Sequence, residues 1–423
     1  MINSGHGESI LLGFEKQYKD SNGFEDGNSS IEAIQKTFHI LIDAGSEKKS
    51  RYIDNNGKVQ QASFDSLKNE LSNLKCHING IIITHVDDDH IGGFIKLFDN
   101  MYYSVKDYMN LVFVLFNDFD QHKIGFRQAN SLSQTLQKRL KDTNTTMLKS
   151  YQENYIIKNA KINQMIEMDG ELLPIRFYDL QSRKALKKIE DYIIHVTLLY
   201  PSTTDTVVKD LMQKWKKYNE DPKTKNDKSE KLKNENSIAV LIEYEQCKIV
   251  LGGDGYLKNI SQSLENLADS SEKAFKIDVM KLLHHGAIEN NDGIIEFIKE
   301  HKCEKLLYSA NGINHKEHPN IEMIYQILKE FPKIEIYATN TIPEEIWDKQ
   351  WDNLGPEKSK EILKFLLETT DSEWVAKNYT TGKEDLKKNV NSFDDKKIKN
   401  MILACLNEKI KKAEDFKNGI IVR

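Results

Sequence analysis

The stretch Gly80–Gly93, which reads GIIITHVDDDHIGG, decides the expected fold of this chain. It opens with a short, β-branched apolar run that predicts a buried strand over residues 80–84. Apolar residues at helical spacing precede this run at residues 64–74, and a second helix is expected to begin at Gly92. An apolar strand between two helices is typical of a parallel sheet with both faces covered. The stretch therefore predicts an α/β fold.

Four side chains that can bind a metal lie between the predicted strand and the following helix: His85, Asp87, Asp89 and His90. Open α/β sheets usually bind their ligands at such strand ends. With Asp88, three carboxylates stand close together, and their repulsion is costly unless a cation binds there. A metal site accounts for this composition; an acidic surface loop with two incidental histidines is the alternative.

Three further motifs place His or Asp next to Gly or Pro after an apolar run. They are GGDG at residues 252–255, LHHG at 283–286 and NHKEHP at 314–319. Each has an ordinary explanation by itself: a turn aspartate, core or surface histidines, and a helix cap. Their repetition at strand ends indicates that Asp254, His284, His285 and His318 share one site with residues 85–90.

The rest of the chain alternates predicted strands and helices as far as about residue 340. Strands are expected at residues 9–14, 38–43, 111–116, 193–200, 237–242, 248–253, 277–283 and 305–309. With 423 residues, the chain is long enough for more than one domain. We expect a catalytic domain over residues 1–340, with helical insertions at about 100–190 and 219–234, and a charged helical extension over 341–423.

Composition excludes some classes of protein. The chain holds 60 Lys and Arg against 65 Asp and Glu, so it is not a globally basic nucleic-acid binder, although net charge does not exclude a local basic patch. The four cysteines are far apart, which argues against a zinc ribbon or a disulfide framework and favours a reducing cytoplasm. We expect no signal peptide and no membrane span, because no apolar stretch approaches about 20 residues.

Taken in order, H-x-D-x-D-H-x-G-G, G-D, H-H-G and N-x-x-x-H-P resemble the motifs of the metallo-β-lactamase fold. More narrowly, they resemble the ComEC-type branch of that superfamily, which has Asp, here Asp87, in place of the second His of H-x-H-x-D-H. Three further matches to the branch lie at residues 5–11, 41–45 and 234–237. Glu8 replaces the usual Asp of the first of these matches, and the superfamily's middle metal histidine has no obvious counterpart.

The resemblance implies an αββα sandwich with two divalent metal ions at one edge. The ligands that it implies are His85 and Asp87 for the first ion, Asp89 and His90 for the second, Asp254 as a bridge, and His284 or His285. We favour His284 as the last ligand and expect the other histidine to touch the substrate. Asp43 would orient a ligand histidine. The set is rich in oxygen, so we expect Mn²⁺ or Zn²⁺, with Mn²⁺ slightly favoured.

Such a site favours hydrolysis of phosphodiesters, because two metal ions lower the pKa of a water and clamp a phosphoryl group. The resemblance implies catalytic roles for Asp89, His285 and His318, with His318 near the leaving oxygen. Nucleic acid is the expected substrate, and the scarcity of arginine favours cleavage with little sequence preference. The lysine-rich residues 214–217 and 223–233 would supply a phosphate track or would simply be solvated.

Two other functions stay open. In one, the same site hydrolyses a small cyclic nucleotide or another small ester, with the insertions covering the pocket. In the other, the protein is a partner-regulated effector of a bacterial antiphage defence system. The extension after Pro343 would then bind a protein partner such as an NTPase, or a second copy of the chain would complete a homo-oligomer. Alternatively, the extension packs on the catalytic domain.

Overall fold

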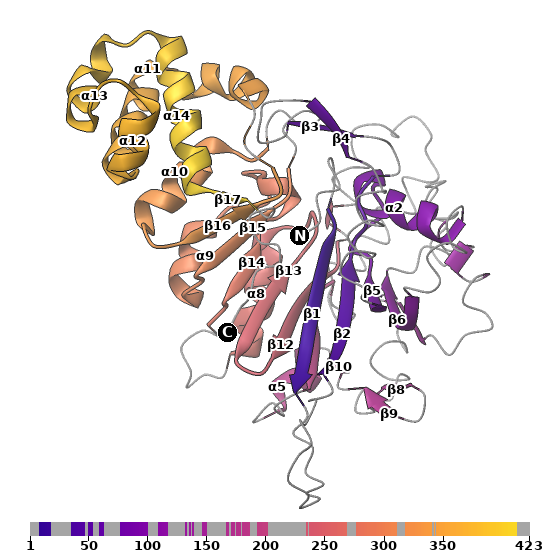
Figure 1. Ribbon diagram of the computed structural model, residues 1–423. Coiled ribbons are helices and arrows are strands. Elements are labelled where there is room, and N and C mark those ends of the chain that lie inside the picture. Colours follow the sequence, from indigo (N-terminus) through magenta and orange to yellow (C-terminus); the bar gives the residue numbers. More distant parts are fainter. Residues whose placement is uncertain are drawn as a thin grey trace, which may run out of the picture.

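The computed structural model has a mixed α/β fold with two mixed β-sheets, which confirms the predicted class. The C-terminal helices gather at one end of the molecule (Figure 1). No helix among the described residues is long and apolar enough to cross a membrane. The structure describes residues 8–17, 35–46, 50–53, 59–62, 77–99, 109–116, 132, 135, 136, 138, 146–149, 166–168, 171–173, 175–178, 180–186, 193–201, 234, 235, 237–268, 276–310, 318–340, 342 and 344–412.

The first sheet has the strand order β1-β2-β5-β6-β7. The strands are β1 (Ile10–Gln17), β2 (Gln35–Ile42), β5 (Ile78–Ile82), β6 (Met109–Phe116) and β7 (Thr146–Lys149). β1 is antiparallel to β2, and the other neighbours are parallel. The strand predicted at residues 80–84 is β5, in the middle of the sheet. It ends earlier than predicted because the backbone N–H of Thr84 donates to the Asp43 carboxylate instead of a neighbouring strand.

The second sheet has the order β10-β11-β12-β13-β14-β15-β16-β17. Its strands are β10 (Ile175–Tyr178), β11 (Ile194–Tyr200), β12 (Ala239–Tyr244), β13 (Cys247–Leu251), β14 (Val279–Lys281), β15 (Lys305–Tyr308), β16 (Glu335–Ala338) and β17 (Lys411–Lys412). β12 is antiparallel to β11 and β13, and the remaining neighbours are parallel. β12 and β13 form the predicted hairpin. Because β6, β7 and β10 lie within residues 100–190, this range contributes strands to both sheets.

The two sheets pack face to face through one apolar layer. On β5, Ile82 faces this layer and Ile81 faces away from it. On β12, Val240 faces the layer and Leu241 faces away from it. Successive strand residues point to opposite faces, so an apolar residue at every position means that both faces are covered.

Helices cover the outer faces of the two sheets. On the first sheet, α2 (Asp88–Asp99) packs through Phe94, Leu97 and Phe98 against Ile81 and neighbouring strand residues. On the second sheet lie α8 (Leu257–Leu267), α9 (Ile294–His301) and α10 (Ile321–Glu330), and α5 (Leu180–Lys184) contacts β10 and β11. The molecule is therefore layered as helix, sheet, sheet, helix (Figure 1).

The charged C-terminal extension packs on the second sheet. Its helices are α11 (Glu344–Thr369), α12 (Ser372–Asn378), α13 (Lys383–Asn389) and α14 (Asp395–Lys409), with the 3₁₀ turn η4 (Val390–Ser392) before α14. Buried residues such as Leu363, Leu366 and Ile402 belong to the same apolar cluster as α9 and α10. β17, which follows α14, pairs with β16. The apolar face of the extension is thus buried within the chain.

Two hairpins complete the described elements, namely β3 (Ser50–Ile53) with β4 (Val59–Ala62) and β8 (Ile166–Met168) with β9 (Glu171–Leu173). The helix predicted at residues 64–74 and the lysine-rich segments at 214–217 and 223–233 lie outside the described residues.

Candidate metal centre

Histidine and aspartate side chains from both sheets meet at one edge of the sandwich. They come from the loops after β5, β13 and β14 and from the first turn of α2. In chain order they are His85, Asp87, Asp89, His90, Asp254, His284 and His285. All the residues implied as ligands by the sequence motifs are therefore brought to one place.

A close backbone approach joins the loops of the two sheets. Gly253 has a φ of +51°, and a Cβ there would lie 2.5 Å from the hydroxyl oxygen of Thr84. The backbone N–H of Ile238 also donates to the carbonyl of Thr84 at 2.8 Å. The left-handed backbone and the lack of space both require glycine at position 253. This contact sets the next residue, Asp254, against the loop after β5.

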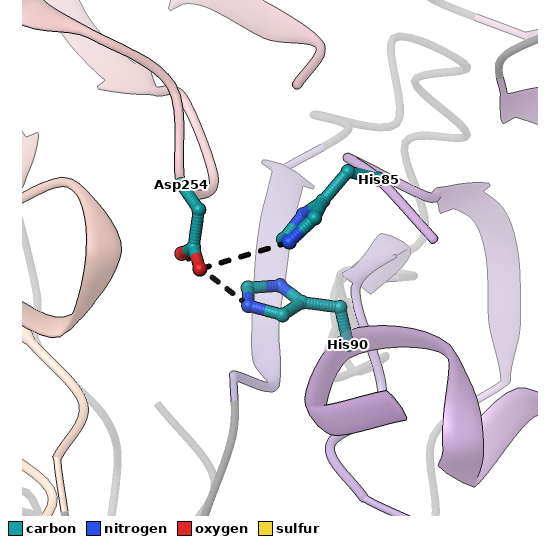
Figure 2. A group of neighbouring side chains, drawn as sticks. All are labelled: His85, His90 and Asp254. Carbon is teal, nitrogen blue, oxygen red and sulfur yellow. Dashed lines mark ion pairs between the residues drawn. The ribbon is translucent and has the colours of Figure 1, made fainter. Parts of the chain in front are cut away.

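The centre of the site is a buried group of His85, His90 and Asp254 (Figure 2). One carboxylate oxygen of Asp254 lies 3.3 Å from Nε2 of His90, and the other lies 3.6 Å from Nε2 of His85. The three side chains are at most 4% exposed. Figure 2 shows both rings pointing at the carboxylate, so their Nε2 atoms and the carboxylate oxygens face a common point.

A second group shares His90 with the first and adds Asp89 and His285. One oxygen of Asp89 lies 3.0 Å from Nε2 of His285 and 3.9 Å from Nε2 of His90. Asp87 lies on the other side, with its carboxylate 3.8 Å from Nε2 of His85. The two groups share His90, so carboxylate oxygens and Nε2 atoms extend beyond the central group, and the donor set is large enough for two cations.

Several of these atoms contact one another as ion pairs but lack a regular hydrogen bond. Nε2 of His85, Nε2 of His90 and one oxygen of Asp254 are buried, and none makes a hydrogen bond of regular geometry. Leaving such groups unpaired in a protein interior costs about 1–3 kcal/mol each. Imidazole nitrogen and carboxylate oxygen are ordinary ligands of Zn²⁺ and Mn²⁺. The residues therefore fit a bound divalent cation.

Neighbouring groups hold the two central rings with Nε2 toward the site. Nδ1 of His90 lies 2.7 Å from the Asp43 carboxylate, which also accepts hydrogen bonds from the backbone N–H and the hydroxyl of Thr84 at 2.8 and 2.6 Å. Nδ1 of His85 lies 3.1 Å from the Thr84 hydroxyl. Asp43 thus orients His90, the arrangement expected for a residue that supports a metal ligand.

The carboxylates and burial perturb the two central histidines in opposite directions. Burial opposes a charge on His90, but Asp254, Asp43 and Asp89 outweigh burial and raise the pKa of His90 well above its usual value. Burial, followed by repulsion from His90, lowers the pKa of His85 well below its usual value. His90 is therefore the more readily protonated ring of the two, and a cation that binds its Nε2 must displace a proton from that atom.

The structure separates the roles of His284 and His285. Nε2 of His285 belongs to the second group, its Nδ1 lies 2.6 Å from the Ser309 carbonyl, and its side chain is 3% exposed. The His284 side chain is 24% exposed, and its Nε2 lies 3.6 Å from Asp254. The geometry thus favours His285 as the ligand and His284 on the solvent side, whereas the sequence favoured His284. The turn itself decides this, because both residues have positive φ.

Asn290, which sequence reasoning missed, holds the His284 ring. Its side-chain N–H groups donate to the carbonyls of Asp254 and Gly255 at 2.8 and 3.0 Å. The amide oxygen therefore faces Nδ1 of His284, at 3.0 Å. This contact holds the ring with Nε2 directed at the Asp254 carboxylate, 3.6 Å away. The sequence did not indicate that Asn290 orients His284, because an asparagine in a loop has no pattern that predicts such contacts.

His318 stands at the open side of the site. Its ring centroid lies 5.0 Å from that of His284, and it precedes α10. Asn314 and His315 lie outside the described residues. The side chain of Asp88 faces another way, since it accepts a hydrogen bond from the Ser46 hydroxyl at 2.6 Å. Of the three consecutive aspartates, Asp87 and Asp89 thus lie at the site, whereas the Asp88 side chain contacts Ser46.

A buried ion pair lies beneath the site. Lys281 and Glu8 are both fully buried and in contact, and the Lys281 ammonium also donates to the Gly253 carbonyl at 3.2 Å. The backbone N–H of Glu8 donates to the carbonyl of Asp89 at 3.0 Å. Lys281 was not predicted to contribute to the site. It joins β14 to the loop that carries Asp254 and to the N-terminal motif.

Neither comparison, with protein-family models or with curated proteins, finds a match to the chain.

Proposed function

We propose that the protein is a dinuclear metal-dependent hydrolase with a metallo-β-lactamase-like fold that cleaves phosphodiester bonds in nucleic acid. One observation carries the proposal: Nε2 of His85, Nε2 of His90 and an oxygen of Asp254 converge while buried, and none of them makes a hydrogen bond of regular geometry. A structural cluster would pair these atoms with protein groups. The order of layers and the motifs at strand ends support the proposed fold.

The donor atoms suggest how two cations would be held. Asp254 lies between the two sides of the site and would contact both ions. His85 and Asp87 would hold one ion, and Asp89, His90 and His285 would hold the other. Three carboxylates against three imidazoles favour Mn²⁺ or Zn²⁺ over softer metals. When bound, such ions supply a water of lowered pKa and neutralise phosphate charge.

Two histidines lie where they would meet a substrate. His284 faces the solvent side of the site, and His318 adjoins it. Either imidazole can donate a proton to a leaving oxygen or a hydrogen bond to a phosphate oxygen. We assign these roles to His284 and His318, with His318 nearer the leaving group. Asn290 keeps Nε2 of His284 directed inward, so His284 is the more constrained of the two.

The test is cleavage of labelled single- and double-stranded DNA and RNA with Mn²⁺, Zn²⁺, Mg²⁺ or EDTA. We expect cleavage that requires Mn²⁺ or Zn²⁺ and is lost in Asp89→Ala. Asp88→Ala is the matched control, because its carboxylate belongs to the same acidic run but contacts Ser46; it should stay active. Cleavage that survives EDTA or Asp89→Ala would contradict the proposal.

A negative result with all four polymers, from protein shown to hold metal, would replace the proposed substrate. A small cyclic nucleotide or another small ester would be assayed next on the same preparation. Protein inactive on these as well would correspond to an effector that awaits a partner such as an NTPase. Metal binding itself is measured separately by elemental analysis, so the substrate and the metal centre are tested independently.

A further inference from the structure

The segment that carries His318 is held by two parts of the chain. On one side, the backbone N–H of Asn320 donates to the Gly286 carbonyl at 3.0 Å. A Cβ at Gly286 would lie 2.9 Å from Pro319, so the proline ring packs directly on the turn that contains His284 and His285. This side ties the segment to the metal centre.

On the other side, one side chain of the C-terminal extension makes two hydrogen bonds to the same segment. Gln350, on α11, donates from Nε2 to the Pro319 carbonyl at 3.0 Å. Its Oε1 accepts from the backbone N–H of Ile321 at 2.9 Å. Gln350 is buried, so these hydrogen bonds are shielded from water. The amide thus bridges the residues on both sides of Asn320, directly after His318.

The position of Gln350 in α11 connects the C-terminal extension to the segment that carries His318. α11 is interrupted at Gly355, which has a φ of +70° and precedes Pro356. The part before this break carries Gln350, and the part after it carries Leu363 and Leu366, which lie in the apolar cluster shared with α12, α13 and α14. A displacement of the extension would therefore act on the His318 segment through the short part of the helix.

We propose that Gln350 is a positioning residue for His318, so that the C-terminal extension forms part of the active site. This inference rests on the proposed function, in which His318 assists the leaving group. The Gln350 amide holds the backbone beside His318 in the place that brings its ring against His284. Loss of the two Gln350 hydrogen bonds should misplace His318 without disturbing any residue of the two metal-binding groups.

Asn407 provides a matched control within the same extension. Its amide makes an equivalent pair of hydrogen bonds, to the backbone N–H and carbonyl of Ile342 at 2.8 and 3.1 Å. That pair joins α14 to the chain after β16 and does not touch the His318 segment. Gln350→Met and Asn407→Leu keep much of the side-chain volume while removing both hydrogen bonds. The two variants therefore separate a positioning role from a structural one.

The first measurement is Mn²⁺-dependent hydrolysis of bis(p-nitrophenyl) phosphate by the full chain. For Gln350→Met we expect kcat to fall by about 10- to 100-fold, the scale of a misplaced catalytic group, with KM and bound metal nearly unchanged. Asn407→Leu should keep the wild-type kcat. Equal losses of kcat in both variants would overturn the proposal.

The second measurement does not depend on hydrolysis. The rate of carbethoxylation of His318 by diethyl pyrocarbonate is followed by peptide mass spectrometry in each variant. We expect a severalfold change in Gln350→Met and none in Asn407→Leu; an unchanged rate in Gln350→Met would overturn the coupling. Wild-type protein that fails to hydrolyse any phosphodiester, yet shows this change, would refute the proposed function and leave the coupling intact.

Discussion

Two buried clusters of polar side chains differ in how they are balanced, one beneath α5 on the second sheet and one at the candidate metal centre, where loops of both sheets meet. Beneath α5, Arg183 donates to both oxygens of Glu243 at 2.6 and 2.8 Å. Nearby on the same sheet, His195 stacks on Tyr178 and its Nδ1 lies 3.0 Å from the phenol oxygen. At the metal centre, by contrast, Asp254 and two histidines face one another with atoms left unpaired.

The difference shows what burial requires of charged groups. Burial opposes the charge of Arg183, but the hydrogen bonds from its guanidinium to Glu243 outweigh burial and raise its pKa. The α5 cluster is therefore balanced by protein groups alone and has no need of a ligand. The candidate metal centre leaves buried nitrogen and oxygen atoms without a regular hydrogen bond, so we expect a cation to complete its balance. Buried charge by itself does not mark a site; an incomplete set of partners does.

The largest expected effect is a loss of hydrolytic activity, and it distinguishes the metal centre from the α5 cluster. Asp254→Asn should reduce phosphodiester hydrolysis by about 10³-fold or more, since the metal site supplies several kcal/mol of transition-state stabilisation. Added metal should no longer raise Tm, whereas it should raise that of the wild-type chain. Steady-state kinetics and thermal melts with and without Mn²⁺ measure both. A variant that binds metal and turns over normally would contradict the role of Asp254.

The next effect is a loss of folding stability, and it distinguishes the α5 cluster from the metal centre. Arg183→Met leaves Glu243 as an uncompensated buried charge and should lower the free energy of unfolding by about 3–5 kcal/mol. Bound metal per folded chain should not change. Urea denaturation measures the loss, and the double variant Arg183→Met with Glu243→Leu should recover most of it. If the single variant is as stable as the wild type, the α5 cluster does not lock the sheet.

A smaller effect concerns the support of the metal ligands. Asp43→Asn should weaken metal affinity by about 10- to 100-fold, because Asp43 sets the orientation and basicity of His90. Calorimetric titration with Zn²⁺ or Mn²⁺ measures the change. Ser46→Ala is the control, since its hydroxyl contacts Asp88 rather than a ligand. Equal affinities in Asp43→Asn and the wild type would place His90 outside the coordination set.

The smallest effect is a pH dependence of stability that metal-free protein shows and metal-loaded protein lacks. The pKa of His90 is raised in the folded state, so its proton stabilises the metal-free fold below its usual pKa of 6.5, and this stability is lost as pH rises through the folded pKa. The slope is at most about 1.4 kcal/mol per pH unit and histidine. His85, with a lowered pKa, is neutral in both states above pH 6.5 and adds nothing there.

Bound metal removes this dependence because it displaces the same proton. The free energy of unfolding of metal-loaded protein should therefore stay nearly constant over the range in which that of metal-free protein falls, because above pH 6.5 neither the metal-loaded fold nor the unfolded chain holds the extra proton on His90. Urea denaturation at several pH values above 6.5, with EDTA or with saturating metal, compares the two forms. Parallel pH profiles for the two forms would show that His90 does not exchange its proton for a cation.

Much of the fold followed from local patterns. Runs of apolar, β-branched residues predicted β5, β6, β11, β12 and β13, because a strand covered on both faces must be apolar at nearly every position. The residues that meet at the candidate metal centre were also predictable, because they lie in short motifs of His and Asp that follow apolar runs. His284 and His285 were not separable, since which of two adjacent rings turns inward depends on the conformation of the 3₁₀ turn η3 (His284–Gly286).

Contacts between distant segments were not predictable. Asn290 and Lys281 act on the site through hydrogen bonds to backbone carbonyls, which leave no pattern in a sequence. The same holds for Gln350, an ordinary polar residue of a charged helix until its amide is seen to bridge Pro319 and Ile321. A side chain that satisfies backbone groups elsewhere in the fold is recognised only from the fold.

The sequence by itself determined the α/β class and the set of residues that could bind metal, because strand burial and ligand chemistry are properties of residue types at short spacing. Only the tertiary structure decided which of those residues face one another, which of the two adjacent histidines is buried, and that the extension reaches the His318 segment. These depend on how two sheets and a distant helix pack, and packing couples residues hundreds of positions apart.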